Sequence, residues 1–182
     1  MLVACGLSPV QSGEFLIEWV QDFTEGVRAL EKTNAIRMLE RGKLPHAVLY
    51  YEGDGAMSGA EVADVLGLPP EQVFKTLVTT GKSGGHYVFL IPAAEELDLK
   101  KAAATVGEKS VEMLKSKDLL PLTGYVHGGC SPLGMKKAFP TFVDESAEEL
   151  ERMVFSAGKI GVQIEAAPKA LAAAVRVRFA DL

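Results

Sequence analysis

The chain has 182 residues, of which 48% are hydrophobic and 24% charged, and its formal net charge is −5 at pH 7. This length and composition predict one domain with its own core and a short extension. The negative charge excludes a protein that grips nucleic acid with its whole surface, so a nucleic-acid partner would be held locally or delivered by another protein. No apolar run approaches the roughly 20 residues that span a bilayer, so we expect no membrane partner and a cytoplasmic location.

The two cysteines show no metal-binding or disulfide pattern. Cys5 and Cys130 are too few for a disulfide framework, and neither belongs to a metal-ligand spacing. The sequence therefore leads us to expect no metal ion and no cofactor.

The chain begins with a predicted extension, residues 1–32, followed by a domain predicted over residues 33–182. Apolar residues recur every three or four positions over Glu14–Leu30, which predicts an amphipathic helix. This helix would pack on its own domain or form a dimer contact, so the oligomeric state stays open. A second helix is expected over Lys32–Arg41, ending at the glycine that follows.

Strands and capped helices follow in irregular alternation. The predicted helices run from the capping box of Ser58 and Glu61 to Leu66, from Asp98 to Gly107, and from Pro168 to Ala174, with a short turn from Ser116 before Pro121. The predicted strands are Ala47–Tyr51, Val73–Thr80, Tyr87–Ile91, Val111–Met113, Thr141–Val143, Met153–Ser156, Gly161–Ile164 (after a turn at Ala157–Lys159) and Val175–Phe179. We expect an α+β fold, with a mixed, partly antiparallel sheet and surrounding helices.

The strand predicted over Val73–Thr80 carries a lysine among apolar residues. Side chains of a strand alternate between its two faces, so Val73, Lys75 and Leu77 share one face. Lys75 is therefore either an ordinary surface lysine or a cation that faces a cleft.

Glycines are concentrated in Gly124–Lys137, which reads GYVHGGCSPLGMKK. Glycine allows a positive φ and lets a ligand approach bare N–H groups, which together attract anionic oxygen. The spacing of Gly129 and Gly134 is that of a nucleotide P-loop, but Met135 stands where the P-loop lysine is required. The stretch is therefore either a tight structural turn or a loop that binds an anion or a carbonyl group.

Three segments match one family in the same order along the chain. They are Thr33–Tyr51, Phe74–Val78 and Gly124–Lys137. Together they resemble the YbaK family of free-standing aminoacyl-tRNA deacylases, which is related to the editing domain inserted in bacterial prolyl-tRNA synthetases. The resemblance covers nearly everything after the N-terminal extension. It implies the fold of that family and the hydrolytic proofreading of Cys-tRNA(Pro), working beside prolyl-tRNA synthetase.

The resemblance also implies roles for residues at matching positions. The implied catalytic residues are Lys75, Gly128 and Gly129, and the implied substrate-binding residues are Tyr51, Ser131, Pro132 and Gly134. Three positions depart from the usual family pattern, because Gly53, Cys130 and Met135 replace a histidine, an aliphatic residue and a glutamine. These departures leave the amino-acid specificity open more than the reaction class.

The sequence contains no conventional hydrolase pattern, neither a Gly-x-Ser-x-Gly elbow nor a zinc-ligand spacing. His127 is a candidate general base, and Cys130 is a candidate nucleophile, although nothing in the sequence lowers the pKa of its thiol. The family resemblance suggests instead that the substrate's own cysteine thiol attacks its ester carbonyl, because a nucleophile held in place within one molecule reacts fast. Lys75 and the N–H groups of Gly128 and Gly129 would then stabilise the developing charge.

Two other functions remain open from the sequence. An Ala-tRNA(Pro) deacylase would need an activated water, because alanine has no thiol. A non-catalytic module would bind aminoacyl ends or the synthetase, but such a module has no need of Lys75 on an apolar strand face.

Overall fold

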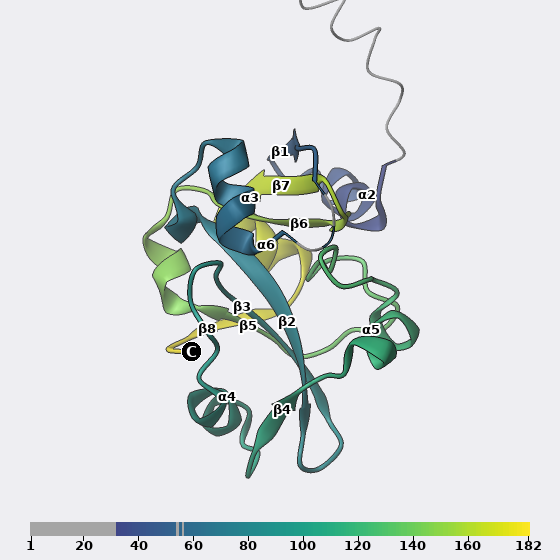
Figure 1. Cartoon of the computed structure of the whole chain (residues 1–182), viewed down its shortest axis with the longest axis vertical. Coiled ribbons are helices and arrows are strands. Elements are labelled where there is room, and N and C mark those ends of the chain that lie inside the picture. The colour runs from purple at the N-terminus through teal and green to yellow at the C-terminus, as the bar shows by residue number, and fades with distance from the viewer. Residues whose placement is uncertain (1–31, 54, 56) are drawn as a thin grey trace, which may run out of the picture. The chain divides into compact units, whose positions relative to one another are not determined.

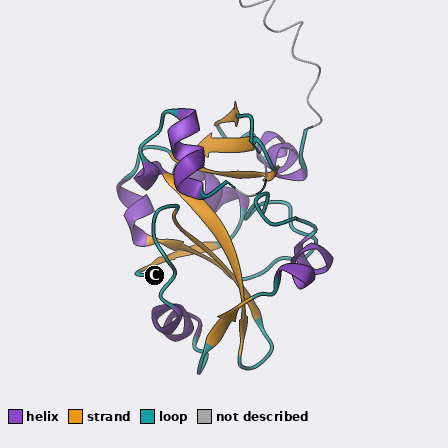
Figure 2. Cartoon of the chain, viewed as in Figure 1, coloured by secondary structure: helices purple, strands orange, loops and turns teal. Residues whose placement is uncertain are grey.

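The computed structural model describes residues 32–182, except for residues 54 and 56. The helix predicted over Glu14–Leu30 lies outside these described residues. From residue 33 onward the chain forms one unit, Thr33–Leu182, in which helices surround a sheet (Figure 1 and Figure 2). None of the helices in the described part is long and apolar enough to cross a membrane.

The unit contains short helices and a mixed sheet, as the sequence predicts. The strands are β1 (His46–Tyr50), β2 (Val73–Gly81), β3 (His86–Pro92), β4 (Val111–Met113), β5 (Thr141–Asp144), β6 (Met153–Lys159), β7 (Val162–Ala166) and β8 (Val177–Ala180). The α-helices are α2 (Asn34–Arg41), α3 (Gly59–Leu66), α4 (Leu99–Val106), α5 (Ser116–Thr123) and α6 (Pro168–Ala174). Short 3-10 helices span Pro70–Gln72 and Glu145–Glu149.

The long strand β2 lies at the centre of the sheet. The strand order is β1-β7-β6-β2-β3-β5-β8, and β4 pairs with the end of β2. Strand β2 runs antiparallel to β3 and β4 but parallel to β6, and the β3–β5 and β5–β8 pairs are also parallel. Parallel and antiparallel pairs in one sheet confirm the predicted mixed α+β architecture.

The two faces of β2 pack against different helices. Phe74 and Val78 belong to the main core cluster, which includes buried residues of α2, α5 and α6. On the other face, Val73 packs in a cluster with α3, and Leu77 packs against a cluster with α4. Lys75 shares this second face, between a residue that packs toward α3 and one that packs toward α4. The strand alternation therefore places the lysine between two apolar clusters, as the sequence predicts.

One predicted turn is in fact a bulged strand. Ala157–Lys159 belongs to β6, and the register between β6 and β7 shifts across this stretch, where Gly158 has a φ of 90°. A glycine with positive φ inside a strand marks a β-bulge as readily as a turn. The reversal into β7 lies one residue later, at Ile160 and Gly161.

A second local prediction is also wrong, because the short turn predicted from Ser116 is the eight-residue helix α5. Pro121 lies inside this helix, and the residue that caps it is Lys115. Proline removes one N–H donor, but the last turn still closes through bonds from Thr123 Oγ1 to the Leu119 carbonyl and from Gly124 N–H to the Leu120 carbonyl.

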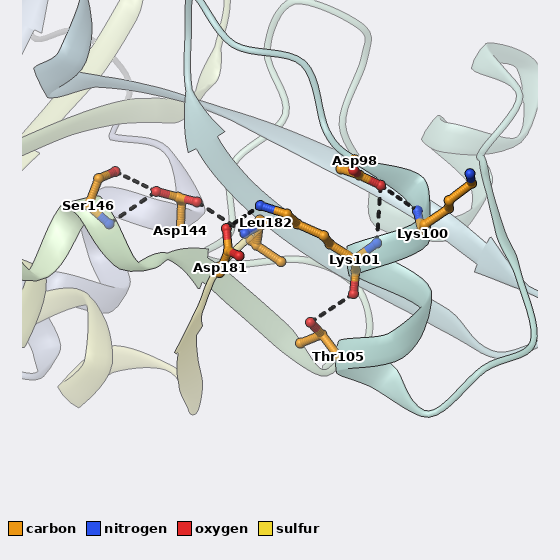
Figure 3. Close-up of polar contacts among 8 residues, drawn as sticks. All are labelled: Asp98, Lys100, Lys101, Thr105, Asp144, Ser146, Asp181 and Leu182. Carbon is orange, nitrogen blue, oxygen red and sulfur yellow. Dashed lines mark hydrogen bonds and ion pairs between the residues drawn. The ribbon is translucent and has the colours of Figure 1, made fainter.

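Helix α4 is tied to the last residues of the chain (Figure 3). Asp98 caps the helix by accepting hydrogen bonds from its first N–H groups, and Lys101 pairs with Asp181. The N–H of Leu182 donates to Asp144 at 3.3 Å, and the Leu182 side chain is buried in the cluster that includes α4. These contacts hold α4 against the face of the sheet that carries Lys75.

Candidate active site

A pocket of about 490 Å³ runs along β2. Its walls come from the end of β1 and the start of α3, from the β4–α5 segment, and from the turn at residues 127–130. The described residues that line it are apolar or neutral and polar, with the single exception of Lys75. A cation without a neighbouring carboxylate is suited to bind an anion or a carbonyl oxygen that gains negative charge.

Lys75 is anchored by one backbone carbonyl. Its Nζ donates a hydrogen bond to the Ala93 carbonyl at 3.2 Å, and the Ala93 N–H in turn donates to the Val73 carbonyl at 2.7 Å. The acceptor is therefore fixed to the strand that carries the lysine. Among the described residues, Lys75 forms no ion pair. An ammonium group has three N–H donors, so two of them remain available to a ligand in the pocket.

The start of α3 borders the pocket beside Lys75. Ser58 Oγ accepts from the Glu61 N–H at 3.3 Å, and the Glu61 carboxylate accepts from the Ser58 N–H at 2.7 Å, which completes the predicted capping box. The hydrogen bond from the Ser58 backbone lowers the pKa of Glu61. Gly59 lies directly against Ala93, because a Cβ added at this glycine would be 2.5 Å from the Ala93 Cβ.

The glycine stretch presents a four-residue turn to the pocket. The Gly129 N–H donates to the Val126 carbonyl at 3.1 Å, and Gly128, the third residue of this turn, has a φ of 78°. A positive φ at this position is what a type II turn requires, and glycine adopts it without strain. His127 and Gly128 line the pocket, whereas Gly129 is buried and its N–H is already used. Of the two glycine N–H groups, only that of Gly128 has no partner among the described residues.

Tyr125 holds the turn in place from behind. Its hydroxyl donates to the Leu133 carbonyl at 2.6 Å, and a Cβ on Gly134 or Gly158 would lie within 2.9 Å of its side chain. Burial, with a contribution from Cys130, raises the pKa of Tyr125 to about 12, so the phenol stays protonated as the donor. The tyrosine thus connects both ends of the glycine stretch to the bulge in β6.

The residues that the structure describes activate neither the candidate nucleophile Cys130 nor the candidate base His127. Burial raises the pKa of the Cys130 thiol to about 12, so the thiolate is scarce at neutral pH. His127 lines the pocket, but its ring makes no hydrogen bond to any residue that the structure describes. In the described part of the chain, no group of three His, Cys, Asp or Glu side chains is arranged to hold a metal ion.

The structure brings together only some of the seven predicted site residues. Tyr51, Lys75 and Gly128 line the same pocket. The other four do not line the pocket: Gly129 closes the turn, and Ser131, Pro132 and Gly134 follow it in the chain. Ser131 is fully buried and its Oγ accepts from the Leu133 N–H at 3.3 Å, while Gly134 packs against Asn34 at the start of α2. Their contacts in this structure support the turn, and a direct contact with substrate remains a prediction.

Three features of the pocket were not predicted from the sequence: the Ala93 carbonyl, Ser156 and Gln163. The carbonyl of Ala93 is a backbone group, which no sequence pattern reveals. Ser156 and Gln163 are opposed in the β6–β7 ladder and both line the pocket, and Gln163 is only 6% exposed. Gln163 could have been predicted as a pocket residue, because it is a polar residue inside the largely buried strand Val162–Ala166.

Comparison with known proteins identifies the domain. Residues 54–174 match the family described as an aminoacyl-tRNA editing domain. This chain belongs to that family. The Enterococcus faecalis protein EbsC, whose proposed activity is Cys-tRNA(Pro)/Cys-tRNA(Cys) deacylation, is 46% identical to this chain over 153 residues, covering 84% of this chain and 93% of EbsC.

Two further relatives show the editing domain in different settings. The proline–tRNA ligase of Trichlorobacter lovleyi is 27% identical over 130 residues, which is 71% of this chain but only 23% of the ligase. The crystal structure of a proposed trans-editing enzyme for prolyl-tRNA synthetase matches with a TM-score of 0.70 and 28% identity, covering 81% of this chain and 91% of the other. The family and the fold expected from the sequence are therefore confirmed.

Proposed function

We propose that this protein hydrolyses the aminoacyl ester of misacylated tRNA, with Cys-tRNA(Pro) as its principal substrate. Membership of the editing family and 46% identity to EbsC support the reaction class. The observation that carries the proposal is the position of Lys75, an ammonium without a neighbouring carboxylate among the described residues, in the pocket that Gly128 also lines. Attack on an ester places negative charge on its carbonyl oxygen, and this arrangement is suited to stabilise that charge.

Lys75 and Gly128 would divide the stabilisation of the charged oxygen between them. The ammonium donates one hydrogen bond to Ala93 and keeps two N–H groups for the substrate. The N–H of Gly128 is the second donor, because the N–H of Gly129 closes the turn on Val126. Removing one such donor from a developing charge costs about 10²–10³ in rate in well-studied enzymes.

The nucleophile in this proposal is the thiol of the substrate's cysteine. Its sulfur attacks the carbonyl carbon of the ester, and the bond from that carbon to the ribose oxygen breaks. The proton lost by the thiol ends on the ribose oxygen, so the tRNA leaves with a free hydroxyl and the cysteine leaves as a thiolactone. Cys130, whose pKa is about 12, is poorly suited to compete with this intramolecular attack.

Prolyl-tRNA synthetase is the proposed partner, in the cytoplasm. The chain carries a net charge of −5, so it lacks the general positive charge by which proteins bind tRNA on their own. A synthetase that releases the mischarged tRNA next to the editing domain would supply the missing affinity.

The test is single-turnover deacylation of tRNA(Pro) carrying cysteine, serine, alanine or proline, each with and without prolyl-tRNA synthetase. We expect cysteinyl-tRNA to be hydrolysed fastest and seryl-tRNA far more slowly, because a hydroxyl is a much poorer nucleophile at neutral pH. Addition of the synthetase should increase the rate on cysteinyl-tRNA.

Each alternative gives a different pattern in the same experiment. Equal rates on cysteinyl- and seryl-tRNA would rule out attack by the substrate thiol and indicate a base on the enzyme. Preference for alanyl-tRNA would assign the protein to alanine editing with an activated water. Binding of all four substrates without hydrolysis would identify a non-catalytic module.

A further inference from the structure

We infer that Gly59 is a positioning residue for Lys75 and that it acts through the carbonyl group of Ala93. The inference rests on the proposed function, because the position of the ammonium affects the rate only if Lys75 contacts the substrate.

The contact between Lys75 and Ala93 orients the ammonium. A lysine side chain has four rotatable methylene bonds, so its strand position alone leaves the direction of its N–H groups undetermined. One hydrogen bond, from Nζ to the Ala93 carbonyl at 3.2 Å, fixes one of the three tetrahedral N–H directions. The remaining two are then restricted to a cone around that axis.

The second contact fixes the carbonyl itself. Ala93 is the residue after β3, where the chain leaves the sheet, and its N–H donates to the Val73 carbonyl at 2.7 Å. Its side chain is 7% exposed and packs in the cluster that joins β2 to α3. The first turn of α3 covers it, so the start of this helix limits how far Ala93 can move.

The contact between α3 and Ala93 requires a residue without a side chain. A Cβ at position 59 would lie 2.5 Å from the Ala93 Cβ and 3.3 Å from its Cα, whereas ordinary contacts are 3.4–4 Å. These two atoms of Ala93 cannot move away by a side-chain rotation. A methyl group at position 59 must therefore displace Ala93 or the start of α3 by about an ångström. A misplacement of about 1 Å can cost roughly 10²-fold in rate.

The test begins with Gly59→Ala in the full chain, measured by steady-state deacylation of cysteinyl-tRNA and by thermal melting. We expect kcat to fall roughly 10- to 100-fold with little change in KM, because the added methyl group lies against Ala93 and displaces the ammonium. The double variant Gly59→Ala/Ala93→Gly moves the methyl group from one side of the contact to the other and should restore most of the rate. In a Lys75→Ala background, Gly59→Ala should cost almost nothing further.

A matched control separates positioning from loss of helix stability. Glu61→Ala breaks the capping box of the same helix turn, and Glu61 does not line the pocket. We expect this variant to melt earlier but to keep its kcat. The variant Ala93→Gly introduces no crowding, and alone it should lose only a few-fold in kcat, because it loosens the carbonyl.

A second readout does not depend on activity. The rate at which acetic anhydride acetylates Lys75 is measured by mass spectrometry. This rate should change several-fold in Gly59→Ala and return toward the wild-type value in the double variant. The inference is overturned if Gly59→Ala keeps both the wild-type kcat and the wild-type acetylation rate, or if its cost in kcat is the same without Lys75. If the wild-type protein hydrolyses no aminoacyl-tRNA but the acetylation rates change as expected, the proposed function fails and the positioning role stands.

Discussion

Two of the walls of the pocket are built in different ways. On one wall, β2, β3 and the start of α3 position Lys75 through ladder hydrogen bonds and side-chain alternation. The second of these walls is the turn at residues 126–129, in a segment without regular structure, and it depends on Tyr125 and on glycines behind it. The first wall carries the only charge among the described residues that line the pocket, whereas most glycine-stretch residues support the turn.

This difference leads us to expect that the wall with Lys75 carries the chemistry and that the residues behind the turn support the fold. A regular strand needs no special residues to place a side chain, so a functional group can be replaced there without loss of the fold. An irregular turn has no such framework, so its backbone must be held by glycines with a positive φ and by close contacts. Substitutions in the Lys75 wall should therefore mainly reduce activity, and substitutions behind the turn should mainly reduce stability.

The largest effect on activity is expected for Lys75→Ala. Removing the ammonium should lower the rate of single-turnover deacylation roughly 10²–10³-fold or more, because a hydrogen-bond donor to the developing charge is lost. The melting temperature should hold or rise slightly, because a charge is removed from a largely apolar strand face.

Lys75→Arg is the matched control that keeps the charge. It should not restore the rate, because the planar guanidinium is larger and directs its donors differently. A folded Lys75→Ala protein with a near-wild-type rate would show that this wall does not carry the chemistry.

A large effect on stability is expected for Gly134→Ala, behind the turn. Gly134 has a φ of 69°, and a Cβ here would lie 2.9 Å from both the Asn34 Cβ and the Tyr125 hydroxyl. Gly67 has a similar φ of 65° but open space around it, so Gly67→Ala measures the backbone strain alone. We expect that control to cost about 1–2 kcal/mol in free energy of unfolding and Gly134→Ala to cost clearly more. Equal losses in denaturant titrations would mean that the close packing behind the turn does not matter.

The smallest effect on activity is expected for Cys130→Ala. The thiol is 9% exposed and is protonated at neutral pH, because burial raises its pKa to about 12. The variant should keep most of its activity, and thiol-blocking reagents should inhibit the wild-type protein little. A loss of several hundred-fold, together with a trapped acyl-enzyme, would instead make Cys130 the nucleophile.

The same thiol predicts how stability depends on pH. A pKa that is higher in the folded than in the unfolded state means that the unfolded chain releases the proton first, so stability falls as pH rises above about 9. One such group contributes a slope of at most about 1.4 kcal/mol per pH unit. Between pH 8.5 and 10, the melting temperature should therefore decline less steeply with pH for Cys130→Ala than for the wild-type protein. This range lies below most of the Tyr125 titration, so Tyr125 contributes little to the difference.

The sequence predicted the elements that depend on local chemistry. The capping box at Ser58 and the glycine after α4 locate helix ends correctly, because a cap satisfies backbone groups within the same few residues. Alternation along β2 placed Lys75 with Val73 and Leu77, because the period of a strand is independent of its partners. The family likewise follows from motifs that can be read in order along the chain.

Only the tertiary structure decided which of these residues meet. Gly158 suggested a turn in the sequence but forms a bulge in β6, because the pairing with β7 lies beyond local sequence. Lys75 and its acceptor Ala93 are 18 residues apart, and the contact of Ala93 with Gly59 depends on how α3 docks. Such contacts join segments that are distant in the chain, and burial and packing between them have no local signature. The sequence by itself thus determined the family and its lysine, and folding decided how that lysine is held.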